Sequence, residues 1–138
     1  MPARDLYHDN LKTALIKDGW IITDDPYTMK FEDATLYADL RAERPLAAER
    51  GGCRIVVEIK SFLGPSLYND WERALGQYEV YRRILQVIDP QSELFLAIDT
   101  DAFVNFFQRK SVQLVVQKSH VKLLVVRLED EEVDQWIS

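Results

Sequence analysis

The hydrophobic pattern of the chain centres on one short run, Arg54–Lys60, which reads Arg-Ile-Val-Val-Glu-Ile-Lys. Ile and Val favour strands, and successive residues of a strand point to opposite faces. One face of this predicted strand is wholly apolar and carries Ile55, Val57 and Ile59. The other face ends in Glu58 and Lys60, whose charges are costly to remove from water unless they are paired or bound to a metal. The run therefore either ends in a functional site or leaves the core with both charges in water.

Three helices are predicted from apolar residues that recur with helical spacing. They cover Asp5–Asp18, Tyr68–Ile88 and 101–118. Asp5 is expected to cap the first helix, and Gly19 to end it in the left-handed conformation. Asn69 or Asp70 is expected to cap the second helix, and the third has a candidate break at Ser111.

Apolar runs and period-two alternation predict the strands. They are Trp20–Thr23, Thr35–Arg41, Cys53–Ser61, Leu94–Ile98, Val121–Leu128 and Val133–Ile137. Gly51-Gly52 predicts a tight hairpin, which would make Thr35–Arg41 and Cys53–Ser61 antiparallel neighbours. Leu46–Glu49, between them, is a further short strand or a continuation of the second. This order of elements predicts an α/β fold, a mixed β-sheet flanked by helices, in one domain over residues 1–138.

Composition narrows the class of protein. The 138 residues are 47% hydrophobic and 29% charged, as in an ordinary globular domain. No apolar run approaches the roughly 20 residues that span a bilayer, and the N-terminus lacks the apolar core of a signal peptide. The single cysteine, Cys53, excludes an internal disulfide and any multi-cysteine metal site. We therefore expect a cytoplasmic protein without membrane contact. The net charge of −6 argues against a general DNA coat, because non-specific DNA affinity comes mainly from Lys and Arg.

A second carboxylate, Asp39, lies in the predicted strand that would pair with the central one. If these strands pair suitably, Asp39, Glu58 and Lys60 converge at one end of the sheet. A simple hairpin at Gly51-Gly52 would instead place position 45 opposite Glu58, so convergence requires an irregularity around Arg41 to Pro45 or a bend in the strand.

Two carboxylates suit Mg²⁺, a hard ion that takes oxygen ligands, with Mn²⁺ as the alternative ion. Asp39, Glu58 and the backbone carbonyl of Ile59 are the expected ligands. The ion would favour ionisation of water and offset charge on a phosphoryl oxygen. Lys60 would stabilise the developing negative charge. The reaction implied is hydrolysis of a phosphodiester.

The pattern Asp39 followed by Glu58-Ile59-Lys60 resembles the PD-(D/E)xK nuclease superfamily, with its restriction-endonuclease-like fold. Ala38 stands where that pattern has proline. Gln77 and Tyr81 are four residues apart and so share a helix face. RecB-type nucleases of this superfamily carry a similar pair beside the metal site, which implies a catalytic role for Gln77 and an auxiliary one for Tyr81. The alternatives are an exposed helix residue for Gln77 and a core residue for Tyr81.

The chain as a whole resembles the XisH-type proteins, the fdxN element excision controlling factors of cyanobacteria. The resemblance is carried by Pro2–Asp9, Ala14–Trp20, Ala47–Arg50, Ile55–Phe62, Ala74–Glu79 and Gln135–Ile137. It implies an endonuclease-like fold, a role in excision of a DNA element by a recombinase, and an XisI-type companion protein. Two functions remain open: a Mg²⁺-dependent endodeoxyribonuclease, and a catalytically silent accessory protein that binds its companion or the recombinase. DNA contact is then direct or indirect, and a homo-oligomer is compatible with both.

Further candidates lie near the predicted site. The superfamily resemblance implies an additional ligand from the first helix, for which His8 or Asp9 is available; the alternative is a solvated helix face. Glu43 and Glu49 are alternative carboxylates if the strand register differs. In a third interpretation, Glu58 only pairs with Lys60 or Arg54.

Overall fold

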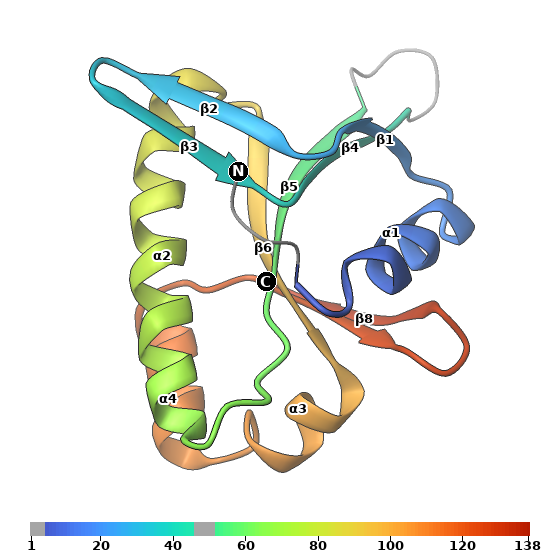
Figure 1. Cartoon of the computed structure of the whole chain (residues 1–138), viewed down its shortest axis with the longest axis vertical. Coiled ribbons are helices and arrows are strands. Elements are labelled where there is room, and N and C mark those ends of the chain that lie inside the picture. The colour runs from blue at the N-terminus through green and yellow to red at the C-terminus, as the bar shows by residue number, and fades with distance from the viewer. Residues whose placement is uncertain (1–4, 46–51) are drawn as a thin grey trace.

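The computed structural model describes residues 5–45 and 52–138 and is organised around a six-stranded mixed sheet (Figure 1). In spatial order its strands are β1 (Ile21–Asp24), β4 (Leu40–Arg44), β5 (Cys53–Ile59), β6 (Ser92–Asp99), β7 (Leu123–Arg127) and β8 (Glu132–Ile137). The pairs β5–β6 and β6–β7 are parallel, whereas β1–β4, β4–β5 and β7–β8 are antiparallel. The predicted α/β class with a mixed sheet is confirmed.

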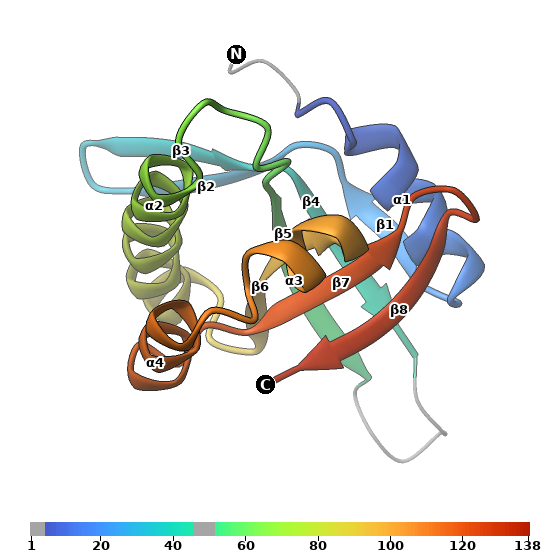
Figure 2. The ribbon, with the colours of Figure 1, turned by 90° about the horizontal axis from the view of Figure 1, so that it is seen from below.

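Helices cover both faces of this sheet, as Figures 1 and 2 show. One face carries α1 (His8–Lys17), and the other carries α2 (Leu67–Ile88) and α4 (Lys110–Lys118). The short α3 (Thr100–Asn105) follows β6 directly. A separate two-stranded ribbon, β2 (Tyr27–Phe31) with β3 (Ala34–Ala38), packs against α2.

The two faces of β5 enter two different hydrophobic clusters. Ile55, Val57 and Ile59 pack with Leu11, Leu15 and other residues under α1. Val56 belongs to the cluster that contains Trp71 and Tyr78 of α2. The predicted alternation is therefore correct, and Glu58, two residues after Val56, lies on the α2 side of the strand.

The helix boundaries differ from the predictions in three places. α1 begins at His8 with Tyr7 as its N-cap and no side-chain capping bond, so the predicted cap at Asp5 is wrong, whereas Gly19 follows the helix with the expected positive φ of 93°.

Ser66 caps α2 and accepts a hydrogen bond from the Asn69 backbone at 3.3 Å, so neither Asn69 nor Asp70 is the cap. The predicted helix 101–118 is two helices, α3 and α4, and its break precedes Ser111, which lies inside α4. Phe106 and Phe107 are buried between the two helices, and packing rather than local propensity places the break there.

The ribbon was not predicted in full. Its first strand, Tyr27–Phe31, has the period-two alternation of a strand but follows a proline. The predicted strand Thr35–Arg41 is interrupted by a bend at Asp39, where the chain leaves the ribbon and enters the main sheet. The predicted Leu46–Glu49 strand lies outside the described residues. No helix in the described part of the chain is long and apolar enough to cross a bilayer.

One buried hydroxyl ties α2 to the sheet. The Tyr78 Oη donates to the Leu94 carbonyl at 2.9 Å and accepts from the Lys122 backbone N–H at 3.0 Å. The Tyr78 side chain is almost completely buried. If its hydroxyl were removed, water would not reach the Leu94 carbonyl and the Lys122 N–H to replace these hydrogen bonds.

We expect Tyr78→Phe to lower the free energy of unfolding by about 1–3 kcal/mol, because it leaves a backbone carbonyl and a backbone N–H without a partner. Urea denaturation measures this change. The control is Tyr37→Phe, since the Tyr37 hydroxyl has no hydrogen bond among the described residues. Equal, small losses in both variants would contradict the expectation.

Candidate functional site

The register between β4 and β5 decides whether the predicted site exists. Leu40 pairs with Val57, and the pairing continues without irregularity to Arg44 and Cys53. Extended by one residue, this register places Asp39 opposite Glu58. The connection therefore spans residues 45–52, and the predicted two-residue hairpin at Gly51-Gly52 is wrong. Of the two predicted alternatives, the irregularity is absent between Arg41 and Arg44, whereas a bend in the strand is present at Asp39.

Backbone N–H groups of Asp39 and Ile59 hold the two carboxylates of Asp39 and Glu58 in place. The Asp39 N–H donates to Glu58 Oε1 at 3.2 Å, and the Ile59 N–H donates to Asp39 Oδ2 at 2.7 Å. Asp39 reaches this position because it occupies the bend between β3 and β4. The convergence expected of these two carboxylates is thus present in the fold.

Burial perturbs the ionisation of both carboxylates. Glu58 is only 5% exposed, and this burial, reinforced by the neighbouring Asp39 carboxylate, raises its pKa to about 8. Burial also raises the pKa of Asp39, although the hydrogen bond from Ile59 acts in the opposite direction. The pair therefore holds a proton more readily than two ordinary carboxyl groups, because burial outweighs the opposing charge of Lys60.

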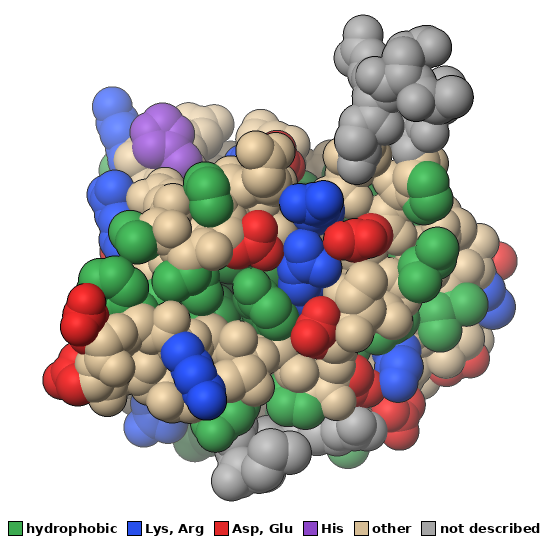
Figure 3. Space-filling model, turned by 90° about the horizontal axis from the view of Figure 1, so that it is seen from above, with side chains coloured by type: hydrophobic (Ala, Val, Ile, Leu, Met, Phe, Trp, Pro, Cys, Tyr) green, Lys and Arg blue, Asp and Glu red, His purple; other side chains and the backbone are tan. Residues whose placement is uncertain are grey.

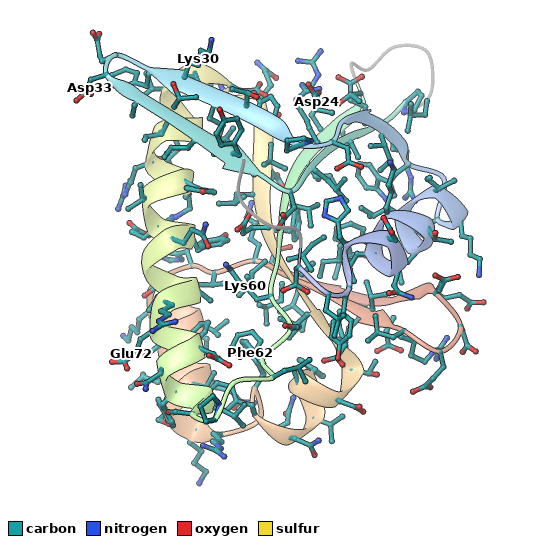
Figure 4. The ribbon with its side chains drawn as sticks, viewed as in Figure 1. Asp24, Lys30, Asp33, Lys60, Phe62 and Glu72 are labelled. Carbon is teal, nitrogen blue, oxygen red and sulfur yellow. The ribbon has the colours of Figure 1, made fainter. Side chains whose placement is uncertain are left out.

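Lys60 is the cation that pairs with Glu58 among the described residues. Its Nζ lies 3.6 Å from Glu58 Oε2, and its side chain stands in the space between β5 and α2 (Figure 4). Arg54 does not pair with Glu58, since it contacts Glu43 at 3.4 Å. Glu43 also bonds Arg41 at 3.1 Å and so is not a carboxylate of this site. Glu49, the other alternative, lies outside the described residues.

His8 approaches the pair from α1. Its Nδ1 lies 3.9 Å from Asp39 Oδ1, is buried, and has no hydrogen-bond partner in the described part of the chain. Its Nε2 lies 2.7 Å from Asp25 Oδ1. Asp9, the other candidate from this helix, is exposed. Between the two predicted alternatives, the structure brings His8 to the site.

Asp25 is the residue near this site that the sequence does not indicate. It stands in the run Asp24-Asp25-Pro26, whose composition points only to the end of a strand. In the fold it accepts bonds from His8 and from Lys12, whose Nζ lies 2.7 Å from Oδ2. Burial acts against ionisation of Asp25, but these two partners hold its pKa below the ordinary value.

Gln77 and Tyr81 share one face of α2, as their spacing predicts. The Gln77 Nε2 donates to the Tyr81 Oη at 3.0 Å, and this hydroxyl donates to the Tyr37 carbonyl at 3.2 Å. Burial raises the pKa of Tyr81, while Glu58 and Asp39 add to the increase, so the hydroxyl lies within their electrostatic reach. The ring itself packs in the core. Tyr81 thus combines a core position with a polar end at the bend.

A cavity of about 260 Å³ adjoins Lys60 and opens beside the carboxylates' strand. Ser61, Asp70 and Arg73 line it together with Lys60, and Arg73 has no ion pair within the described ranges. A larger cavity of about 650 Å³ lies against α2 and the end of α4, where it is lined by Arg82, Lys118 and His120 among others. The smaller cavity adjoins the candidate site through Lys60, whereas Asp39, Glu58 and His8 do not line it.

The donors present define what ion the site could hold. Across residues 5–45 and 52–138, no group of three or more His, Cys, Asp or Glu side chains is arranged to hold a metal ion. Asp39 and Glu58 offer two carboxylates, and the buried Nδ1 of His8 faces one of them without a partner in those ranges. A cation that keeps several waters fits this donor set, and Mg²⁺ is such an ion.

The raised pKa of Glu58 predicts a pH-dependent stability. The folded state binds the Glu58 proton more tightly than the unfolded state, whose pKa lies near the reference value of 4.5. This contribution to stability is fully present below about pH 4.5 and is lost as the pH rises through about 8. Glu58→Gln removes this pH dependence. The free energy of unfolding of the variant, relative to that of the wild type, should therefore be about 1–3 kcal/mol higher at pH 9 than at pH 5.

Denaturant unfolding of the metal-free protein at both pH values measures this change. Glu93→Gln, at an exposed carboxylate, is the matched control and should show no comparable gain. A difference between Glu58→Gln and wild type that is the same at both pH values would contradict the shift.

Comparison with known proteins shows what the chain is similar to. Residues 1–134 match the family described as XisH protein. A crystal structure of an XisH family protein from Nostoc punctiforme PCC 73102 is 36% identical with a TM-score of 0.89, covering 97% of this chain and 100% of that one. The crystal structure of an fdxN element excision controlling factor protein from Anabaena variabilis is 39% identical with a TM-score of 0.87, covering 98% and 100%. No curated protein matches the chain. The chain belongs to the XisH family.

Proposed function

We propose that this protein is a DNA-element excision controlling factor whose Asp39–Glu58 pair binds Mg²⁺ and whose site hydrolyses DNA phosphodiesters. The excision role follows the relative from Anabaena variabilis, which is described as an fdxN element excision controlling factor. The chemical role rests on one observation: a buried carboxylate, Glu58, lies beside a partly buried one, Asp39, and Lys60 is the cation paired with Glu58 among the described residues. The proposal also assigns the fold to the PD-(D/E)xK nuclease superfamily.

In this proposal, some residues at the site bind the ion and another stabilises negative charge. Asp39, Glu58 and the Ile59 carbonyl would hold the ion, with His8 as an auxiliary ligand. A divalent cation supplies positive charge that favours ionisation of water and offsets the charge of a phosphoryl oxygen. Lys60 stands within reach of the same space and stabilises negative charge that develops there.

Two residues of α2 support this arrangement. The Tyr81 hydroxyl bonds the Tyr37 carbonyl, which immediately precedes the end of β3, and so holds the bend that carries Asp39. Gln77 holds that hydroxyl through its amide and lies one turn from Arg73, which lines the cavity beside Lys60. A phosphodiester backbone would follow this cavity, where Arg73 and Lys60 offer the positive charges.

A second function is favoured by the charge of the chain. The net charge is −6, and Figure 3 shows Lys and Arg side chains interleaved with Asp and Glu on the described part of one face. Such a surface suits a protein partner better than extended contact with DNA. The alternative is therefore a silent site in an accessory protein that binds an XisI-type companion or the recombinase.

Cleavage assays test the chemical role. We expect the protein to cleave plasmid, single-stranded or branched DNA with Mg²⁺ or Mn²⁺. Lys60→Ala should lower the rate by about 10²–10³-fold, because it removes the cation that stabilises developing charge. The control is Lys30→Ala, at the exposed ribbon and far from Lys60 (Figure 4). A rate unchanged in Lys60→Ala would refute the assigned mechanism.

A reconstituted excision reaction distinguishes the two functions. If the nuclease function holds, Glu58→Ala and Lys60→Ala abolish excision but leave binding to the companion protein intact on gel filtration. Excision that survives both substitutions, together with a stable complex, would establish the accessory function instead.

A further inference from the structure

The side of α2 that points away from the sheet carries an exposed stripe of small and apolar residues. Gly76, Val80, Arg83 and Val87 follow one another at intervals of four, three and four residues, the spacing that places side chains of one helix against a partner helix. Val80 is 51% exposed and Val87 is 64% exposed, and neither belongs to the hydrophobic clusters of the core. Glu72, one turn before Gly76, points away from the sheet in Figure 4. These residues form the outer face of α2.

Gly76 has no role within the described fold that requires glycine. A Cβ atom at this position would meet no atom within 4 Å apart from its chain neighbours and the backbone of its own helix, whereas a Cβ at Gly64 would lie 2.6 Å from Asp70 Oδ1. Glycine in the middle of a helix lowers the stability of that helix relative to alanine. The missing side chain instead lets another backbone or side chain approach α2 closely.

The cavity of about 650 Å³ beside Gly76 carries opposite charges toward its two ends. Glu72 lines one end of the wall that α2 forms, and it has no ion pair within residues 5–45 and 52–138. Arg82 and Arg83 line the other end and share the single carboxylate of Glu79. From Glu72 to Arg83 the helix rises about 16 Å. One end therefore has an unpaired negative charge, and the other has an excess of positive charge.

A groove with this polarity is complementary to its own copy in the opposite direction. If two α2 helices pack antiparallel about a two-fold axis at the level of Tyr78, Glu72 of each copy lies opposite the arginines of the other. Val80 of each copy then lies over Gly76 of the other, where the missing side chain leaves space for it. An acidic partner such as DNA would be repelled by Glu72, and a uniformly basic partner would be repelled by the arginines.

We propose that the outer face of α2 binds the same face of a second copy of this protein, in an antiparallel two-fold arrangement. Such an interface is isologous, so each favourable contact occurs twice. The valines supply apolar area at its centre, and the contacts of Glu72 with Arg83 at its ends fix the register and the direction. The inference goes beyond the proposed function and does not depend on it, because Lys60 lies on the side of α2 that faces the sheet (Figure 4).

Sedimentation velocity of the metal-free full chain tests the dimer. We expect the weight-average sedimentation coefficient of the wild type to rise from the monomer value to the dimer value over an ~100-fold range of protein concentration. Glu72→Arg places a cation opposite Arg83 of the other copy at both ends and should weaken dimerisation at least ~10-fold. Arg83→Glu should weaken it to a similar extent. The double variant Glu72→Arg/Arg83→Glu should recover dimerisation, because it exchanges the two charges.

The matched control is Asp33→Arg, which makes the same change of charge at an exposed position in the turn between β2 and β3 (Figure 4). It should leave dimerisation unchanged. Gly76→Leu should abolish the dimer, because its side chain fills the space that Val80 of the other copy would occupy. Circular dichroism of a dilute sample of this variant should show a helix content and a melting temperature no lower than those of the wild type, since leucine favours helices more than glycine does.

Two results would overturn the proposal. A wild type that remains monomeric over the whole concentration range would leave the outer face of α2 to a different protein. A dimer that is equally stable in the wild type, Glu72→Arg and Gly76→Leu would form through another surface of the chain.

Discussion

The register of the β4–β5 pair is the constraint on which the candidate site depends. Leu40 and Ala42 of β4 pack with Val57 of β5 in the cluster under α1, and this packing sets the register. Because side chains alternate, a slip of one residue would turn these apolar side chains away from the core and also separate Asp39 from Glu58. The hydrophobic contacts on the α1 face thus position the carboxylates at the end of the sheet.

The end of the sheet that carries Asp39 and Glu58 also holds buried polar groups whose desolvation lowers the stability of the fold. The buried Glu58 lies beside the partly buried Asp39 and 3.6 Å from Lys60, and the buried Nδ1 of His8 has no hydrogen-bond partner among the described residues. A buried charge or polar atom raises the free energy of the folded state unless a hydrogen-bond partner or an opposite charge satisfies it. Buried acids with raised pKa values cluster at functional sites for this reason, and it is the physical argument for assigning chemistry here.

Part of this arrangement is readable in the sequence, and part is not. Alternation within 54–60 predicts both faces of β5, and the four-residue spacing of Gln77 and Tyr81 predicts their contact, because each depends only on local geometry. The register could not be predicted, because Gly51-Gly52 signals a turn whether the strands end beside it or, as here, at Arg44 and Cys53. His8 and Asp25 are 17 positions apart and meet only through tertiary packing, so no local sequence pattern predicts their contact.

The charges of the site also imply that, in the proposed function, cation binding would precede DNA binding. Asp39 and Glu58 repel a phosphodiester when ionised. Among the described residues, Lys60 and Arg73 offer the positive charge at the adjoining cavity, which Asp5 and Asp70 also line. A cation held by the carboxylates reverses the sign of the local potential, which makes the site complementary to a phosphate. In a chain of net charge −6, affinity for DNA would therefore depend on prior occupancy by the ion more strongly than it does in a basic nuclease. Under the proposed function, the acidity of the chain and that of its site would impose the same requirement: a bound cation would have to supply positive charge for contact with DNA.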